Sequence, residues 1–198
     1  MTANAILQAA LAQFAEKGFE GASLAGIAQA VGIKKQSIAT YFPKKEDLFL
    51  AAFQEMARHY IEFLDQLFKE ILGTSAEVRL REIMYRTYYY RVEHPVLTSF
   101  FIRSVQFPAP FFQEMLEQQI SMMEKRSSAF YQAIFEEGMN AGEIRRQRTD
   151  SLLAAYYCLQ DGISMQMFFY NQEEFERRLK DIWEIFWAGI KHTNEGEE

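Results

Sequence analysis

Residues 23–49 read SLAGIAQAVGIKKQSIATYFPKKEDLF, and this stretch decides the fold of the N-terminal region. Apolar residues recur at helical spacing over residues 24–31 and again over residues 35–42. Gly32 separates the two segments, and glycine is the residue that most easily takes the left-handed conformation at a helix end. A proline follows the second segment, and the residue before a proline is disfavoured in a helix. The stretch predicts two short helices joined by a tight turn, with Ser23 as the N-cap of the first.

The rest of the chain keeps the same 3.6-residue period and lacks the alternating pattern of half-buried strands. We therefore expect an all-α protein of about nine helices. A three-helix head over residues 1–45 is joined by one continuous helix, residues 44–72, to a larger helical body over residues 46–198. The remaining helices are expected at residues 3–17, 76–93, 96–107, 110–138, 150–170 and 173–191.

The composition of the 198 residues is that of a globular protein: 49% are hydrophobic, 15% are aromatic and 24% are charged. No apolar run reaches the roughly 18 residues of a membrane span, and the N-terminus lacks the basic region of a signal peptide. The single cysteine, Cys158, excludes an intramolecular disulfide, and we expect it to be a buried, inert thiol. These features predict a cytoplasmic protein without a membrane anchor.

The net charge of −6 conceals an uneven distribution of basic and acidic residues. Residues 1–50 contain five lysines and four acids, whereas the remaining residues contain 16 basic and 23 acidic side chains. Between Lys34 and Lys45 there are four lysines and no acid. Overall acidity therefore does not argue against a nucleic-acid partner, because the positive charge is concentrated in the head.

The two short helices of residues 24–42 form a helix-turn-helix pattern, in which the second helix lies in the major groove of B-DNA. Ile38 and Phe42 are four residues apart and are expected to anchor that helix to the rest of the head. The opposite face carries polar groups of the kind that read base edges, and lysines at its ends can contact phosphates. These residues are Gln36, Ser37, Thr40 and Tyr41 on the face and Lys34, Lys35, Lys44 and Lys45 at its ends.

The segments GFEGAS at residues 18–23, IAQAVGI at 27–33 and YFPKKEDLF at 41–49 closely resemble the head of the TetR family of bacterial transcriptional regulators. The resemblance is strong over residues 5–50 and weak in the body, where it includes residues 136–145. It implies an all-helical two-domain chain, a homodimer, a palindromic double-stranded DNA operator and a small-molecule inducer. The implied function is that of a repressor which an effector releases from its operator.

The resemblance also implies which residues contact DNA. The positions that match DNA-contacting positions of such regulators are Ser23, Lys35, Gln36, Ser37, Thr40, Tyr41 and Lys45. Three other positions depart from the family pattern. Ala39 stands where a phosphate-contacting tyrosine is common, Lys34 where a small capping residue is usual, and Ala25 where some members have a base-contacting arginine. Lys34 can restore a phosphate contact, whereas Ala25 weakens the case for base reading through the first helix of the pair.

The body holds most of the aromatic residues and eight of the nine methionines. Most of these side chains are expected to form a core, but ligand pockets also favour rings and methionine with a few polar groups. Gln119 lies within an apolar helical stripe, and Arg103 lies in the same way between Phe100 and Phe107. We expect a mostly apolar effector whose polar or acidic end meets Arg103 or Gln119. The candidate effector residues are Tyr88, Phe100, Arg103, Phe112, Gln119, Met123, Tyr157 and Gln160.

The last predicted helix is apolar around nearly its whole circumference, with Ile182, Trp183, Ile185 and Trp187 on different sides. A helix that is apolar all round is buried all round. We therefore expect the last two helices to form the interface of a homodimer, which the reading of a two-fold operator also requires.

Two other classes of function remain as alternatives. An enzyme would need a catalytic or metal-binding pattern, but His59, His94 and His192 form none, and no cofactor or metal is expected. A helical adaptor that binds only protein does not explain why the acid-free lysine stretch coincides with the helix-turn-helix pattern. A gel shift with the promoter DNA beside the protein's own gene distinguishes the DNA-binding regulator from the enzyme and the adaptor.

Overall fold

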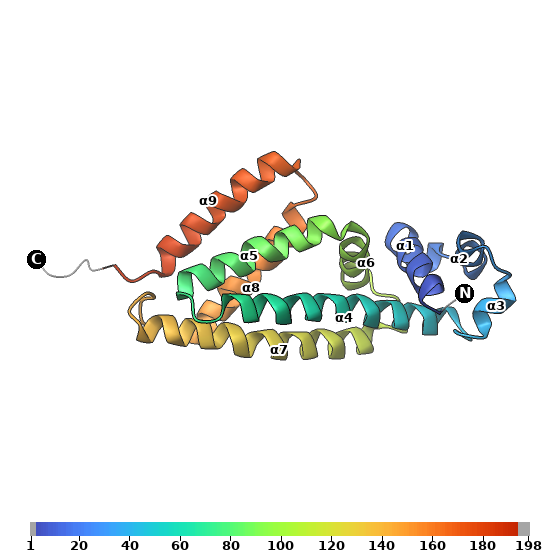
Figure 1. Ribbon diagram of the computed structural model, residues 1–198, viewed down its shortest axis with the longest axis horizontal. Helices are drawn as coiled ribbons and strands as arrows, with labels where there is room; N and C mark the ends of the chain where they lie inside the picture. The colour runs from blue at the N-terminus through green and yellow to red at the C-terminus, as the bar shows by residue number, and fades with distance from the viewer. Residues whose placement is uncertain (1–2, 194–198) are drawn as a thin grey trace, which may run out of the picture. The chain divides into compact units, whose positions relative to one another are not determined.

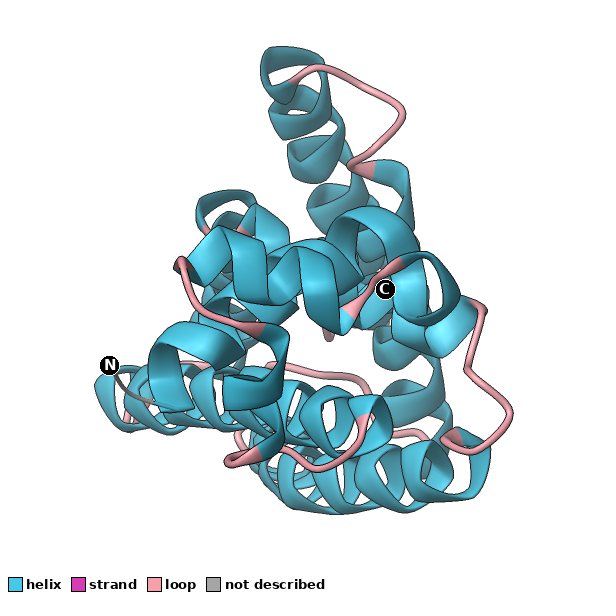
Figure 2. Ribbon diagram, turned by 90° about the vertical axis from the view of Figure 1, so that its right-hand side faces the viewer, coloured by secondary structure: helices cyan, strands magenta, loops and turns pink. Residues whose placement is uncertain are grey.

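The computed structural model describes residues 3–193, and these residues fold into helices joined by loops (Figure 1, Figure 2). Apart from one isolated bridge between Ile144 and Lys191, the described residues form no β-structure. No helix in this range combines the length and the hydropathy that a membrane span requires. The all-α prediction is confirmed. The helices of residues 3–193 are α1 (Ala3–Gly21), α2 (Leu24–Val31), α3 (Lys35–Ala39), α4 (Lys45–Ile71), α5 (Ala76–Glu93), α6 (Pro95–Gln106), α7 (Gln113–Asn140), α8 (Thr149–Gln166) and α9 (Gln172–Ile190).

Two helices of the head differ from their predicted bounds. Helix α1 continues past Gly18, whose φ of 69° and ψ of −178° make a kink in place of the predicted end. Helix α3 ends at Ala39, three residues early, because the N–H groups of Tyr41 and Phe42 both donate to the carbonyl of Ile38. This tightened turn leads the chain out of the helix just before the proline that was expected to end it.

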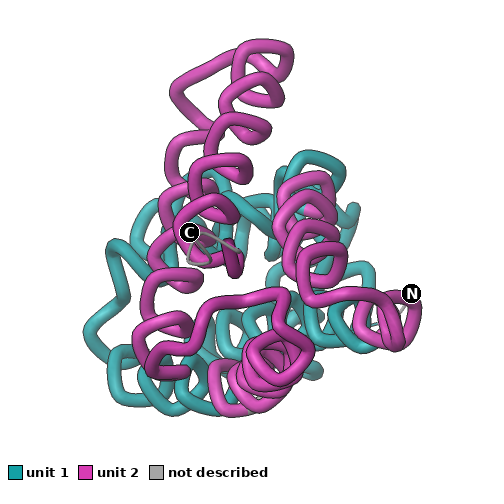
Figure 3. Tube along the Cα trace, turned by 90° about the vertical axis from the view of Figure 1, so that its left-hand side faces the viewer, with its two compact units in different colours: residues 1–65, 91–122 teal, residues 66–90, 123–198 magenta. Residues whose placement is uncertain are grey.

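The chain divides into two compact units, which Figure 3 shows in different colours. The first contains residues 1–65 and 91–122, and the second contains residues 66–90 and 123–198. The division runs through α4, α5 and α7 rather than between helices. It groups α6 with the head, because α1 packs against α6. The predicted boundary between residues 45 and 46 does not coincide with the division into compact units, and as a boundary between a DNA-binding and a ligand-binding part it stays a prediction.

The first unit is built around phenylalanine rings. Phe49 of α4 contacts Phe14 of α1 at 5.0 Å between ring centroids and Phe100 of α6 at 5.2 Å. Phe112, just before α7, lies 5.0 Å from Phe49. All four side chains are at most 3% exposed. Edge-to-face pairs of this kind contribute about 0.5–1.5 kcal/mol each beyond the burial of their area. The core of this unit therefore runs continuously from the head to α6 and the start of α7.

In the second unit, the body segment that resembles the TetR family connects three helices. A Cβ atom at Gly138 of α7 would come within 2.7 Å of the Cβ atom of Ala76 in α5, so only glycine allows this approach. The Glu143 carboxylate accepts a hydrogen bond from the backbone N–H of Glu77 at the start of α5. The carbonyl of Glu143 accepts another from the N–H of His192, just after α9. The segment thus holds α5, α7 and α9 together.

Candidate nucleic-acid interface

Two helix caps define the turn between α2 and α3. The Ser23 hydroxyl oxygen accepts a hydrogen bond from the N–H of Gly26 at 3.0 Å, which confirms the predicted N-cap. At the other end, Gly32 is left-handed, with φ 74° and ψ 32°. The N–H of Ile33 then donates to the carbonyl of Ala28 at 2.9 Å. These bonds satisfy the ends of α2 and set the direction in which the chain enters α3.

Helix α3 has one buried side and one exposed side, as predicted. Ile38 is fully buried in the core of the first unit, and Phe42 packs against the same core just after the helix. The polar residues predicted to face outward are all exposed, and their amide and hydroxyl groups are suited to base edges. They are Gln36, Ser37, Thr40 and Tyr41.

The lysines around α3 have no acidic partner within the described residues. Lys34, Lys35 and Lys44 are exposed, and Lys45 is partly buried at the start of α4. None of the four forms an ion pair with another side chain of residues 3–193. The Asp47 carboxylate instead accepts a hydrogen bond from the backbone N–H of Lys44 at 3.1 Å. The positive charge of this region is therefore uncompensated, which favours contacts with phosphates.

Lys45 also makes a contact that the local sequence pattern does not predict. Its Nζ atom lies 4.3 Å from the centroid of the Phe19 ring, over the ring face. Phe19 lies in the part of α1 beyond the kink at Gly18. The family-like segment GFEGAS marked Phe19 as part of the head, but no local pattern pairs it with a residue of α4.

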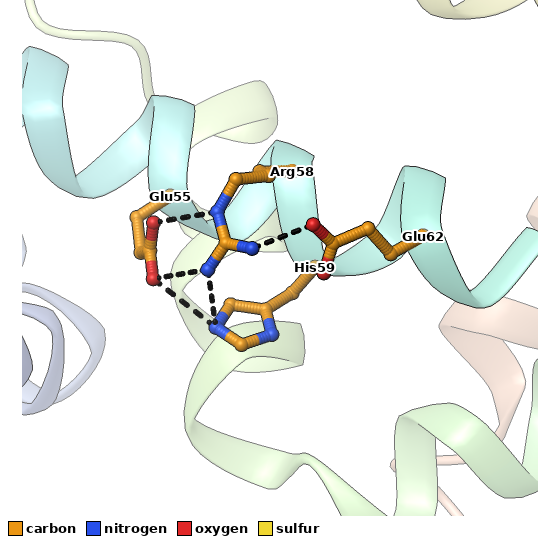
Figure 4. A network of polar contacts seen from close by, with 4 residues as sticks. All are labelled: Glu55, Arg58, His59 and Glu62. Atoms are coloured by element: carbon orange, nitrogen blue, oxygen red, sulfur yellow. Dashed lines mark hydrogen bonds and ion pairs between the residues drawn. The ribbon is translucent and has the colours of Figure 1, made fainter.

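Farther along α4, charged side chains bind one another (Figure 4). The Nε atom of Arg58 donates to Glu55 Oε2 at 3.0 Å, and its Nη1 atom donates to Glu62 Oε1 at 2.6 Å. His59 Nε2 lies 3.2 Å from Glu55 Oε1. The hydrogen bond from Arg58 is the main reason that the pKa of the Glu55 carboxyl is lowered. Among the residues that the structure describes, no three His, Cys, Asp or Glu side chains are grouped so that they could hold a metal ion.

The predicted effector residues are distributed over both units. Three are almost fully buried, three are partly buried, one is buried in a polar network and one is exposed. No contact unites all eight, and their role in ligand binding stays a prediction. Phe100, Arg103, Phe112 and Gln119 belong to the first unit, and Tyr88, Met123, Tyr157 and Gln160 belong to the second.

The expectation that Arg103 and Phe107 lie on a buried stripe of α6 is wrong. Arg103 is exposed, and its Nη2 atom donates to the backbone carbonyl of Glu16 at 3.3 Å. Phe107 is 77% exposed, because the helix ends there and the residue turns out of the helical conformation. The side of α6 that carries Arg103 therefore meets α1 rather than the interior of the body.

In the second unit, two of the predicted effector residues already have protein partners. The side-chain amide of Gln160 accepts a hydrogen bond from the Thr87 hydroxyl at 3.2 Å and donates one to the Tyr156 hydroxyl at 3.3 Å. The hydroxyl of Tyr157 lies 3.1 Å from that of Ser127. The burial of Gln160 therefore needs no ligand to explain it.

Cys158 is exposed, so the expectation of a buried thiol is wrong. Its neighbours at intervals of three and four residues on α8 are also exposed, and all of them except Asp161 are small, so that Cys158 lies on a face of mostly small side chains. The residues of this α8 face are Ser151, Ala154, Ala155, Cys158 and Gly162. Small side chains allow the backbone of another helix to approach closely.

The fold and the exposed face of α3 define the class of this protein: an all-helical chain with a helix-turn-helix head of the kind that binds DNA. Two family models match it. The model described as "Bacterial regulatory proteins, tetR family" matches residues 6–52, and the one described as "QacR-like protein, C-terminal region" matches residues 105–192. The chain belongs to the TetR family of bacterial regulatory proteins.

One curated relative and two solved structures illustrate the likeness. The "Probable HTH-type transcriptional regulator YttP" of Bacillus subtilis is 28% identical over 137 residues, which cover 69% of this chain and 64% of that protein. The crystal structure of the regulator FadR from Bacillus subtilis in complex with stearoyl-CoA has a TM-score of 0.74 at 20% identity and covers 96% of this chain and 100% of its own. A transcriptional regulator from Saccharomonospora viridis in complex with choline has a TM-score of 0.72 at 20% identity, covering 96% of this chain and 97% of its own. At this level of identity, the structural likeness establishes the fold.

Proposed function

We propose that this protein is a ligand-responsive transcriptional regulator that occupies a palindromic DNA operator as a repressor and is released by a small molecule. The observation that carries the proposal is the exposed polar face of α3, flanked by lysines without acidic partners in the described residues. Uncompensated lysines neutralise phosphates and release counterions, while amides and hydroxyls read the bases. Membership in the TetR family supports the same function. Such a bacterial regulator would act in the cytoplasm, where the DNA is.

A homodimer formed through α8 and α9 would give the two-fold symmetry that a palindromic operator needs. The α8 face of small exposed residues supports this interface. On α9, Trp183 is 5% exposed and packs inside its own unit, whereas Ile185 is 76% exposed. Burial of Ile185 against a second copy would remove this side chain from water.

The dimer can be tested with the single cysteine of the chain. A short bis-maleimide should join two copies through Cys158 and give a band of twice the monomer mass. Ile185→Glu should abolish both this band and the dimer peak in sedimentation, because it places a charge in an apolar interface. Glu173→Gln, an exposed change at the start of α9, is the matched control. A folded monomer of the unmutated protein at micromolar concentration would contradict the proposed interface.

We infer that the effector is mostly apolar, with one polar or acidic end. The rings and methionines of the body support this, as does the stearoyl-CoA bound by a regulator of the same fold. Arg103 already donates to Glu16, so Gln119, which is partly buried on α7, is the preferred candidate for the polar end. A ligand releases DNA only if it favours a conformation in which the two heads no longer fit the operator.

The deciding experiment is a gel shift with the promoter DNA beside the protein's own gene. Specific retention that weakens with salt is expected, and acyl or aromatic compounds that raise the melting temperature should release the DNA. Gln119→Trp should block that release and spare operator binding, while the exposed neighbour change Gln118→Trp should leave the response intact. A ligand that stabilises the protein without changing operator affinity would contradict the coupling. Absence of specific retention would favour the adaptor or enzyme alternatives.

A further inference from the structure

Phe19 is in contact with three other rings of the first unit and with one cation. Its ring centroid lies 6.2 Å from that of Phe14, 5.4 Å from that of Phe49 and 4.6 Å from that of Phe111, in the segment between α6 and α7. The Nζ atom of Lys45 lies 4.3 Å from the same centroid. The neighbouring rings therefore fix the Phe19 ring, and the ring in turn supports the lysine at the start of α4.

A ring and a carboxylate hold a lysine with different consequences for its charge. The ring face attracts the ammonium through its quadrupole and carries no net charge of its own, whereas a carboxylate would cancel the positive charge. Lys45 has no ion pair within the described residues, so its charge remains available. A free lysine side chain loses rotational freedom when it binds a phosphate. Contact with a ring restricts the lysine side chain before it binds a phosphate, and this lowers the entropy cost of binding.

We propose that Phe19 is a positioning residue for operator binding and acts through Lys45. The ring holds the ammonium near the DNA-facing start of α4 without neutralising it. The inference rests on the proposed DNA binding and adds to it a residue that acts without touching DNA. Lys44, the adjacent lysine, is exposed and has no ring contact among the described residues, so its phosphate contact should not depend on Phe19.

A double-mutant cycle tests this proposal against a merely structural role for the ring. Operator affinity is measured by fluorescence anisotropy for the unmutated protein, for Phe19→Leu, for Lys45→Met and for the double variant. Phe19→Leu should weaken binding by about three- to tenfold, because the cation–π contact is lost while the apolar volume is nearly kept. The same change should have no further effect in the Lys45→Met background. In a Lys44→Met background its full effect should persist, which makes Lys44 the matched control.

Two further measurements separate positioning from folding. Phe19→Tyr and Phe19→Trp keep a ring face and should bind the operator with nearly unchanged affinity. If Phe19→Leu does not fold, the cycle is repeated with a phenylalanine carrying three ring fluorines at position 19, which keeps the shape of the ring and removes most of its negative face potential.

Either of two results would overturn the proposal. One is unchanged operator affinity on loss of the ring face, and the other is an equal loss with and without the Lys45 ammonium. Failure of the proposed function would look different, because the unmutated protein would then not distinguish operator DNA from unrelated DNA.

Discussion

Two neighbouring stretches of the chain carry basic side chains and use them in opposite ways. In residues 34–45, the four lysines have no acidic partner among the described residues. In residues 55–62, Arg58 is bonded to Glu55 and Glu62 within α4 (Figure 4). A cation that is already paired with a carboxylate adds little to the free energy of DNA binding. An unpaired cation neutralises a phosphate and releases counterions from the DNA, which favours binding. The pairing of the cations, rather than the net charge of −6, identifies the surface suited to DNA.

The largest expected effect comes from reversing the charge of the unpaired lysines. Lys35→Glu combined with Lys44→Glu should weaken operator binding by roughly 100-fold or more at physiological salt, since phosphate contacts are replaced by repulsion in both heads of the dimer. Anisotropy titrations measure the loss. Arg58→Gln, a change to a paired cation on α4, is the control and should leave affinity nearly unchanged. An equal loss of operator affinity in both variants would contradict the difference between the unpaired lysines and the paired arginine.

A smaller and more selective effect is expected on the polar face of α3. Gln36→Ala should cost about 1–3 kcal/mol of binding free energy for the preferred base pair and should relax the preference at that position, because the amide reads a base edge. Competition assays with operator variants measure this change. The salt dependence should stay the same, in contrast to the lysine variants. Gln8→Ala on the exposed side of α1 is the control, and a uniform loss over all sequences would assign Gln36 to the phosphates.

Removing one unpaired lysine should mainly change the salt dependence. Lys45→Ala should weaken binding to all sequences alike and reduce the slope of log K against log salt by about 1 for each head. The paired cation again provides the contrast, because Arg58→Ala should leave the slope unchanged. An unchanged slope for Lys45→Ala would show that this lysine does not contact a phosphate.

The smallest effect concerns the stability of the paired stretch. The hydrogen bond from Arg58 lowers the pKa of Glu55 from its ordinary value of 4.5 in the folded protein. Ionised Glu55 therefore stabilises the fold above that value, and the contribution is lost as the pH falls through the lowered pKa. Arg58→Met should flatten the decrease in unfolding free energy below about pH 4.5, as urea unfolding at a series of pH values would measure. Arg146→Met, at an exposed arginine, should leave the profile unchanged.

Much of the fold is predictable from local sequence, and the errors fall at the ends of helices. Helices α5 and α6 lie within one residue of their predicted bounds, because glycines and prolines mark their ends. Helix α7 begins at Gln113 rather than at residue 110, because the N–H of Phe112 closes a turn onto the carbonyl of Ala109. Helix α8 ends at Gln166, four residues before its predicted end, and a turn follows. The sequence does not mark this turn, because the residues after Gln166 are apolar and continue the helical pattern.

The candidate site was predictable to the extent that it depends on a single helix. The exposed face of α3 follows from the spacing of Ile38 and Phe42, and the structure confirms it. The side that Arg103 faces could not be predicted in the same way. Helix α6 is apolar on one side and packs against α1 on another. The local pattern therefore does not show whether the neighbour of Arg103 is a ligand or a second helix.

By itself, the sequence determined the helices, the turn at Gly32, the polar face of α3 and the acid-free run of lysines. Each of these depends on residues within one or two helical turns of one another, where backbone geometry relates position to direction. Only the tertiary structure decided that Lys45 rests on Phe19 and that Arg103 donates to Glu16. These contacts join residues far apart in the chain, and they depend on how α1 crosses α4 and α6. That crossing is set by the packing of the whole phenylalanine core, which no local period encodes.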